Sequence, residues 1–246
     1  MPAFGPLSAL FREADHPRAD DVEVAWYAAH IPADALALDV MCGWGRVLVP
    51  LAERGCNVHG VDASAAMLAR CDARAATANA RAPTFRQEVS QLNLPLRYGH
   101  AFIADGAFGL LTDPMVAAAA LERIRAHLVD PGALYIDCRI PPAAVQRLGA
   151  PLVEVRTVKL DDGTQIALRS ESMWTAEAQM AHAANRYAHR RGAARLAEEH
   201  ERIASTWYEP EAIVELVRAA GFRDVSTAAA AVTPVEGDAF VVIAQA

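Results

Sequence analysis

The chain has 246 residues, of which 53% are hydrophobic and 22% are charged, a composition typical of a folded globular domain. Its formal net charge of −7 at pH 7 excludes the strongly basic surface expected of a protein that binds nucleic acid or anionic membranes. The four cysteines form no Cys-x-x-Cys pair, which predicts free thiols and neither a zinc nor a redox centre.

The first half of the chain predicts helices that alternate with strands. A helix is expected from about Val22, ending before Pro32. Strands are expected at residues 35–41, 56–61, 84–87, 101–104 and 133–138. Helices are expected at residues 47–53, 64–82 and 115–128, with Ser64 as an N-cap. This order predicts an α/β fold with a parallel sheet covered on both faces.

The pattern changes after Pro141 and Pro142. Period-two stretches at residues 153–159, 165–170 and 181–189 are separated by turn sequences and predict antiparallel hairpins. A helix at 209–220 and strands at 224–230 and 239–244 complete the expected elements. The first residues lack the features of a signal peptide and no apolar stretch could span a bilayer, so we expect a cytoplasmic protein.

A glycine-containing turn after the first predicted strand gives the strongest functional signal. Asp39 lies in that strand, Gly43 and Gly45 lie in the turn, and a helix follows. Glycines let the backbone approach a ligand closely, and a helix N-terminus presents unpaired amides. Asp62 ends the second strand, roughly 20 residues onward, where an acid can bind ribose hydroxyls. The segment therefore predicts a nucleotide-binding crevice.

This turn differs from the dinucleotide fingerprint Gly-x-Gly-x-x-Gly, because Leu48 stands where the third glycine belongs. It resembles the first motif of the class I methyltransferases, acid-x-Gly-x-Gly-x-Gly, with Met41 in place of the first glycine. Met-Cys-Gly-x-Gly-Arg at 41–46 and Gly-Val-Asp-x-Ser-x-x-Met-Leu at 60–68 are similar to a bacterial branch of that family. The resemblance covers the chain from about Val22 to Cys138 and includes the segments 87–89, 94–98, 106–113 and 128–132.

The resemblance implies a three-layer, Rossmann-like sheet of about seven strands, mostly parallel with an antiparallel last strand, plus an inserted antiparallel β-hairpin lid. A single methyltransferase domain is expected over residues 1–246. Its parts are an N-terminal helical cap (1–34), a cofactor-binding half (35–140), the inserted β lid (150–206) and a C-terminal helix with strands (207–246).

The resemblance also implies S-adenosyl-L-methionine as the cofactor and S-adenosyl-L-homocysteine as its product. Asp39 would organise the amino-acid end of the cofactor, and Asp62 would accept hydrogen bonds from both ribose hydroxyls. Met67 could flank the adenine or belong to the core, and Trp26 could cover the site or simply pack. The predicted cofactor-binding residues are Trp26, Asp39, Met41, Cys42, Gly43, Trp44, Gly45, Arg46, Asp62, Ala63, Met67, Glu88, Val89 and Ala104.

Two residues are candidates for catalysis on the acceptor side. Asp105 could act as a base or stabilise positive charge, although an Asp before Gly also favours a turn. His200 lies in a segment similar to small-molecule N-methyltransferases with a hairpin lid. No histidine has a metal-ligand spacing, so no metal site is predicted.

The predicted function is transfer of a methyl group from S-adenosylmethionine to the N, O or C atom of a small molecule. A nicotinamide-dependent oxidoreductase stays open as an alternative, because it would share the crevice and Asp62. A non-catalytic protein that binds S-adenosylmethionine is the second alternative, suggested by Met41 and Trp44. We expect no nucleic-acid or membrane partner, and the β insertion is a candidate homodimer surface.

Overall fold

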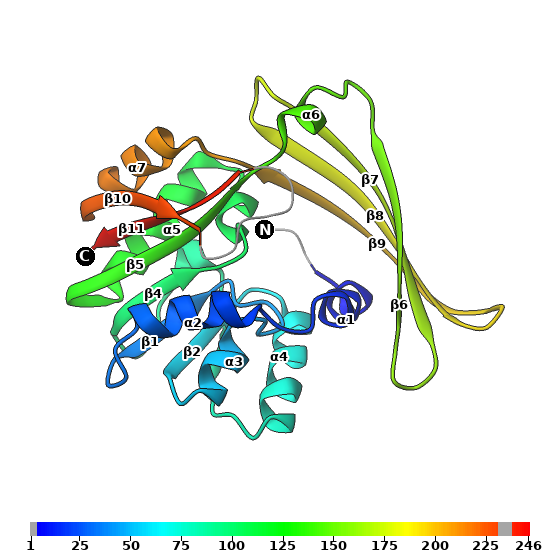
Figure 1. The fold of residues 1–246 in the computed structure, drawn as a ribbon, viewed down its shortest axis with the longest axis horizontal. Coiled ribbons are helices and arrows are strands. Elements are labelled where there is room, and N and C mark those ends of the chain that lie inside the picture. Colours follow the sequence, from blue (N-terminus) through cyan, green and yellow to red (C-terminus); the bar gives the residue numbers. More distant parts are fainter. Residues whose placement is uncertain (1–3, 231–237) are drawn as a thin grey trace.

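A seven-stranded sheet with helices on both faces forms the larger part of the molecule (Figure 1). The computed structural model describes residues 4–230 and 238–246. In spatial order the strands are β10 (Arg223–Ala229), β11 (Asp238–Gln245), β5 (Leu128–Ile140), β4 (Tyr98–Ile103), β1 (Leu36–Val40), β2 (Asn57–Asp62) and β3 (Thr84–Arg86). Only β11 runs antiparallel to its neighbours, β5 and β10, among the described strands of this sheet. The predicted Rossmann-like sheet with an antiparallel last strand is confirmed.

Two layers of helices bury the two faces of this sheet. On one face α2 (Asp21–His30), α3 (Leu48–Glu53) and α4 (Ala65–Thr77) contribute to a single apolar cluster. On the other face the cluster includes α5 (Pro114–Ala126), α7 (Pro210–Ala219) and the short 3-10 helices η1 (Val89–Gln91) and η2 (Ala107–Leu110). The interior strand β1 is therefore buried on both faces, as expected of a parallel strand between helices.

The helix predicted at 64–82 ends earlier than expected. Ser64 caps it as predicted, because its Oγ accepts a hydrogen bond from the Met67 amide at 3.2 Å. The helix ends at Thr77, and Asn79 takes the left-handed conformation with φ of 50°. Asparagine is among the residues that adopt this conformation after a helix, so it stops the helix before Pro83 does.

A second, antiparallel sheet is inserted between β5 and α7, following the short helix α6 (Ala143–Gln146). Its strands follow the order β6 (Leu152–Lys159), β7 (Gln165–Thr175), β8 (Met180–Arg191) and β9 (Ala194–Thr206). The predicted antiparallel insertion is confirmed, but the expected elements did not include β9. Charged residues on both faces of β9, such as Glu199 and His200, mask the alternation of polar and apolar positions that predicts a strand.

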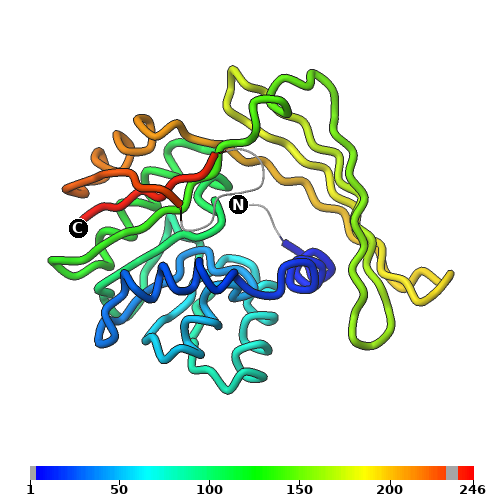
Figure 2. Tube along the Cα trace, in the orientation of Figure 1, coloured from blue at the N-terminus to red at the C-terminus, as the bar shows by residue number. Residues whose placement is uncertain are grey.

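Helix α1 (Pro6–Asp15) lies between the two sheets and contacts the strands of the second sheet (Figure 2). Phe11 is 1% exposed and packs against Tyr187 of β8, with ring centroids 5.6 Å apart. The first turn of α1 has no side-chain cap of its own. Glu199 of β9 accepts instead from the amides of Leu7 and Ser8, at 2.9 and 3.1 Å. The helix is thus attached to the inserted sheet by apolar packing and by a distant carboxylate.

The longest helices in the described ranges have 13 residues, and none of the described helices is long and apolar enough to cross a membrane.

Candidate functional site

A cavity of about 310 Å³ lies at the carboxyl ends of β1, β2 and β4. The chain passes from β1 to β2 on one side and later to β4 on the other, and such a switch point is where open α/β sheets bind ligands. Most of the residues predicted to bind the cofactor line this cavity. They are Asp39, Met41, Cys42, Gly43, Trp44, Arg46, Asp62, Ala63, Met67 and Ala104.

The turn after β1 approaches the cavity through a series of left-handed residues. Met41, Gly43 and Gly45 have φ values of 63°, 55° and 75°. A Cβ on Gly45 would lie 2.6 Å from Cys71 Sγ, so this glycine allows close packing on α4 and does not line the cavity. Met41 has the conformation that favours glycine, which explains why the related motif carries glycine at this position.

Asp62, at the end of β2, presents its carboxylate to the cavity. Oδ2 accepts from the Gly43 amide at 3.0 Å, and Oδ1 accepts from the Ser64 amide at 2.8 Å. Burial raises the pKa of Asp62, while these backbone donors oppose that rise. A carboxylate offers about four acceptor positions, so two donors leave each oxygen free to accept one more hydrogen bond. Ala63 and Met67 provide apolar surface beside it.

Asp39 and Arg46 lie at the other end of the cavity. Asp39 is 2% exposed, and burial raises its pKa well above the ordinary range, while the charge of Arg46 opposes the rise. Arg46 donates to both oxygens of Glu23, at 2.6 and 2.7 Å. This bidentate pair holds the guanidinium between α2 and the turn after β1.

Trp44 forms part of the wall of the cavity. Its Nε1 donates to the carbonyl of His16 at 3.1 Å, and its own carbonyl accepts from Arg74 Nη1 at 2.8 Å. The large side chain therefore connects the turn after β1 to the segment between α1 and α2.

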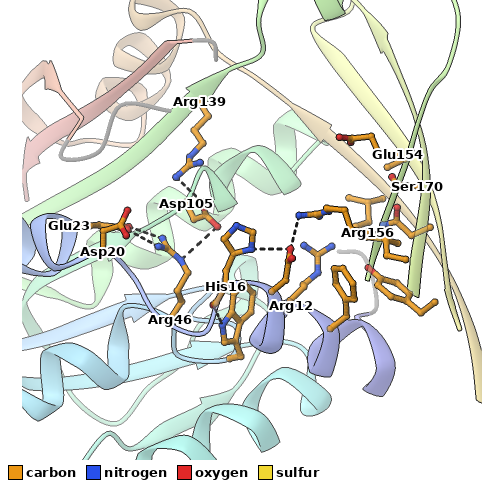
Figure 3. Close-up of a pocket in the computed structure, with 18 residues that line it drawn as sticks. Arg12, His16, Asp20, Glu23, Arg46, Asp105, Arg139, Glu154, Arg156 and Ser170 are labelled. Carbon is orange, nitrogen blue, oxygen red and sulfur yellow. Dashed lines mark hydrogen bonds and ion pairs between the residues drawn. The ribbon is translucent and has the colours of Figure 1, made fainter. Parts of the chain in front are cut away.

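A second cavity of about 630 Å³ lies between α1, the inserted sheet and the carboxyl ends of β4 and β5 (Figure 3). Arginine and acidic side chains from these elements point into it (Figure 3). The residues that line both cavities are Arg12, Trp44, Arg46, Asp105 and Ile203. The two cavities thus share one boundary.

Asp105 lies at this boundary and follows β4. It has a φ of 58°, and its side chain is 45% exposed. Its Oδ1 lies 2.8 Å from Arg139 Nη2, and its Oδ2 lies 3.8 Å from Arg46 Nε (Figure 3). Two guanidinium groups therefore hold the Asp105 side chain between the cavities.

Five of the predicted site residues line neither cavity. They are Trp26, Gly45, Glu88, Val89 and His200. Trp26 stacks on His30 with ring centroids 3.9 Å apart, and Val89 is buried in the core. His200 has a side chain that is 68% exposed, and its Nε2 lies 2.9 Å from Glu198.

Several lining residues were not predicted because they come from the N-terminal segment that includes α1 and from the inserted sheet. They are Phe4, Arg12, Glu154, Arg156, Ser170 and Asn185. The alternation along β7 and β8 could have indicated which side chains share a face, but not that α1 lies against that face. Within residues 4–230 and 238–246, no group of three or more His, Cys, Asp or Glu side chains is placed to hold a metal ion.

Comparisons with known proteins agree with this geometry. Residues 37–132 match the model of a methyltransferase domain family. Comparison with curated protein sequences gave no significant match.

Many solved structures share the fold at low sequence identity. An S-adenosylmethionine-dependent methyltransferase from Clostridium acetobutylicum is 12% identical, with a TM-score of 0.76 over 96% of each chain. An amino pentose methyltransferase from Micromonospora echinaspora is 21% identical, with a TM-score of 0.71 over 96% of this chain and 97% of that one. A sugar N-methyltransferase from a Streptoalloteichus species is 18% identical, with a TM-score of 0.74 over 96% of this chain and 90% of that one.

The comparisons do not address the bacterial branch with the Met-Cys-Gly-x-Gly-Arg motif, which stays a prediction. Residues 37–132 are thus similar to the methyltransferase domain family, and the chain has the fold of the class I methyltransferases.

Proposed function

We propose that this protein is an S-adenosylmethionine-dependent methyltransferase that methylates the nitrogen of a small-molecule amine. The observation that carries the proposal is the pair of adjoining cavities. One is lined by the Asp62 carboxylate and the turn after β1, and the other is larger and polar.

The residues of the smaller cavity fit the chemistry of this cofactor. Asp62 keeps one acceptor position on each oxygen, which suits two vicinal ribose hydroxyls. Ala63 and Met67 offer apolar surface to an uncharged base, and Asp39 is a carboxylate near the place expected for an amino group. When bound, S-adenosylmethionine supplies a methyl group on a positively charged sulfur, so the leaving group is already activated.

The protein's own contribution is to align the acceptor and to exclude water. Arg12 and Ile203, from α1 and β9, close the boundary of the two cavities on the side of the inserted sheet. Asp105 lies at that boundary, so its side-chain oxygens can accept a hydrogen bond from an amine N–H and orient the nitrogen lone pair.

Two of the similar structures favour nitrogen, rather than oxygen or carbon, as the atom that accepts the methyl group. They are an amino pentose methyltransferase and a sugar N-methyltransferase. A neutral amine is also nucleophilic without a strong base. This matches the boundary of the cavities, where the carboxylate of Asp105 is paired with Arg139. We propose no nicotinamide chemistry, because Leu48 is fully buried where the dinucleotide fingerprint requires a glycine.

Substitution of Asp62 tests the cofactor site. We expect Asp62→Ala to weaken the binding of S-adenosylhomocysteine by at least about 100-fold, since two charge-assisted hydrogen bonds at about 1.5–3 kcal/mol each are lost. Isothermal titration calorimetry measures this affinity. Asp34→Ala removes an exposed carboxylate outside the cavities and serves as the control.

Asp62 also accepts from two backbone amides, so the thermal unfolding of the variant must be measured as well. Asp62→Asn keeps an acceptor oxygen and should bind with intermediate affinity. Unchanged affinity in folded Asp62→Ala, or protection of the wild type by NAD and not by S-adenosylhomocysteine, would contradict the proposal. Methyl transfer to a panel of amines, followed by mass spectrometry, tests the reaction itself.

A further inference from the structure

We propose that a polar row across the inner face of the inserted sheet binds hydroxyl groups of the methyl acceptor, so that the acceptor is a hydroxylated, ring-sized amine. The row consists of Glu154, Ser170 and Asn185, all of which line the larger cavity. This inference rests on the proposed function and adds the class of acceptor.

The register of the inserted sheet places these residues side by side. Glu154 of β6 pairs with Ser170 of β7, and Ser170 pairs with Asn185 of β8. Asn185 in turn pairs with Glu201 of β9. Neighbouring strands lie about 4.8 Å apart, so the three cavity-lining side chains span roughly 10 Å. That length suits one six-membered ring with its substituents.

Each member of the row offers an oxygen that can accept a hydrogen bond. Glu154 is exposed and Ser170 is half-buried, so both are open to a ligand. Asn185 is 7% exposed and donates through Nδ2 to Glu201 Oε2 at 3.0 Å. Its Oδ1 has no hydrogen-bond partner within the described part of the chain. A buried carbonyl oxygen without a hydrogen-bond donor is unfavourable. A ligand hydroxyl that packs against Asn185 would supply the missing donor.

Apolar side chains flank the row on the same face of the sheet. Ala183 and Ile203 lie on one side of it. Leu168 lies on the other, in a row with Arg156 and Tyr187. A sugar-like ring has C–H faces and a hydroxyl edge, and this pattern of apolar and polar rows matches both. An unsubstituted hydrocarbon ring would leave the polar row without donors.

The row and Asp105 face the same cavity from different walls. Asp105 lies next to the cofactor cavity, whereas Glu154 and Ser170 lie on the inserted sheet (Figure 3). An acceptor that spans the cavity therefore places its amine toward Asp105 and its hydroxyls toward the sheet. This orientation presents the nitrogen at the boundary where transfer must occur.

Paired probes test the inference. 3-Amino-3-deoxyglucose carries an amine and ring hydroxyls, whereas cyclohexylamine carries the amine alone. We expect the wild type, with S-adenosylhomocysteine bound, to bind the amino sugar at least about tenfold more tightly than cyclohexylamine. Ser170→Ala and Glu154→Ala should each reduce this ratio about 3- to 10-fold, the effect of one lost hydrogen bond. Calorimetry measures the binding, and kcat/KM measures the same preference in turnover.

Glu171→Ala is the matched control, because Glu171 follows Ser170 on the opposite face of β7 and does not line the larger cavity. Asn185 is best observed without substitution, through an NMR shift of its side-chain amide when the amino sugar is added. A wild type without preference for the hydroxylated probe, or a ratio unchanged in both variants, overturns the inference. Failure of the wild type to bind S-adenosylhomocysteine would instead contradict the proposed function.

Discussion

Met41 has a backbone conformation that only glycine adopts without penalty. Its φ is 63°, and its side chain lines the smaller cavity while packing against the core. The left-handed conformation is unfavourable by about 1–2 kcal/mol for a residue with a Cβ. The side-chain contacts of Met41 therefore offset strain that the turn imposes.

Comparison of Met41→Gly with Met41→Ala isolates this strain. Both variants lose the same side-chain packing, but only alanine keeps the Cβ in a left-handed conformation. We expect Met41→Gly to be about 1 kcal/mol more stable than Met41→Ala, the reverse of the usual order of these residues. Urea unfolding gives the free energies, and an alanine variant of equal or higher stability would contradict the explanation.

Asp137 of β5 is 8% exposed and lies beside the boundary of the two cavities. Burial raises its pKa to about 6, although the charge of Arg139 opposes the rise. Because this value exceeds the ordinary value of 3.8, the folded protein binds the proton more tightly than the unfolded chain does. The free energy of unfolding should therefore fall as pH rises from about 4 to about 6.

Asp137→Asn removes this dependence. We expect the variant to be more stable than the wild type at pH 7.5 by up to about 3 kcal/mol, with the difference disappearing below pH 4. Chemical denaturation at four pH values measures it. Asp130→Asn, at an exposed carboxylate paired with Arg223, is the control and should show a much smaller difference. Equal stability of Asp137→Asn and the wild type at pH 7.5 would refute the assignment.

At the scale of elements, the attachment of α1 to β9 sets the position of the N-terminal helix. Glu199 accepts from the first amides of α1, where a negative charge is also favoured by the helix dipole. Next to it, Ser8 Oγ donates to the buried Glu201 at 2.7 Å. Arg12, which is part of this helix, lines both cavities.

Removal of the Glu199 carboxylate should loosen this attachment. We expect Glu199→Ala to lower the free energy of unfolding by about 1–2 kcal/mol, as loss of an N-cap does, and to weaken acceptor binding. Differential scanning calorimetry and acceptor titration measure the two effects. Glu198→Ala, on the opposite face of β9, removes screened surface pairs with Arg186, Arg195 and His200 and should change neither quantity appreciably.

The strands and helices of the larger sheet could be predicted because the sequence of each follows one recognisable pattern of apolar and capping residues. A continuous apolar run such as 35–41 predicts a buried parallel strand, and a capping serine before an alanine-rich segment predicts the start of a helix. The prediction of β9 failed because Glu199 and Glu201 face α1 while His200 faces outward, so both faces carry charge. Helix α1 was not delineated, although Leu7, Leu10 and Phe11 have helical spacing after Pro6.

At the scale of the whole molecule, one small apolar cluster joins helix α1 to the inserted sheet. Phe11 of α1 packs with Val158, Ile166, Leu168 and Tyr187 of the inserted sheet, apart from the two larger clusters. The inserted sheet has no second helix in this cluster within the described residues. Its order should therefore depend on α1 more than the order of the larger sheet does.

Phe11→Ala tests this dependence. We expect a loss of about 3–5 kcal/mol from the local stability of the inserted sheet. Hydrogen exchange should become faster in β6 to β9, while β1 and β4 keep their protection. Uniformly faster exchange over both sheets would show instead that they unfold as one unit.

The two cavities differ in how far the sequence predicted them. The cofactor side comes largely from the continuous segment around 39–67, where glycines and acids have a characteristic spacing. The larger cavity, which we propose holds the acceptor, brings together α1, β5 and four strands of the insertion, and no local pattern joins such distant segments. Tertiary packing alone places Arg12, Arg139 and Ser170 in one cavity.

The separation of the two cavities also has an evolutionary consequence. The wall on the inserted sheet consists of alternate residues of β6, β7, β8 and β9, and the turns that join these strands, such as the one at Gly163, lie outside both cavities. With the acceptor bound in the larger cavity, as we propose, mutations in residues 152–206 can change which acceptor fits while the turn after β1 and Asp62 stay the same. A lineage of such enzymes can diversify its products without rebuilding its source of methyl groups.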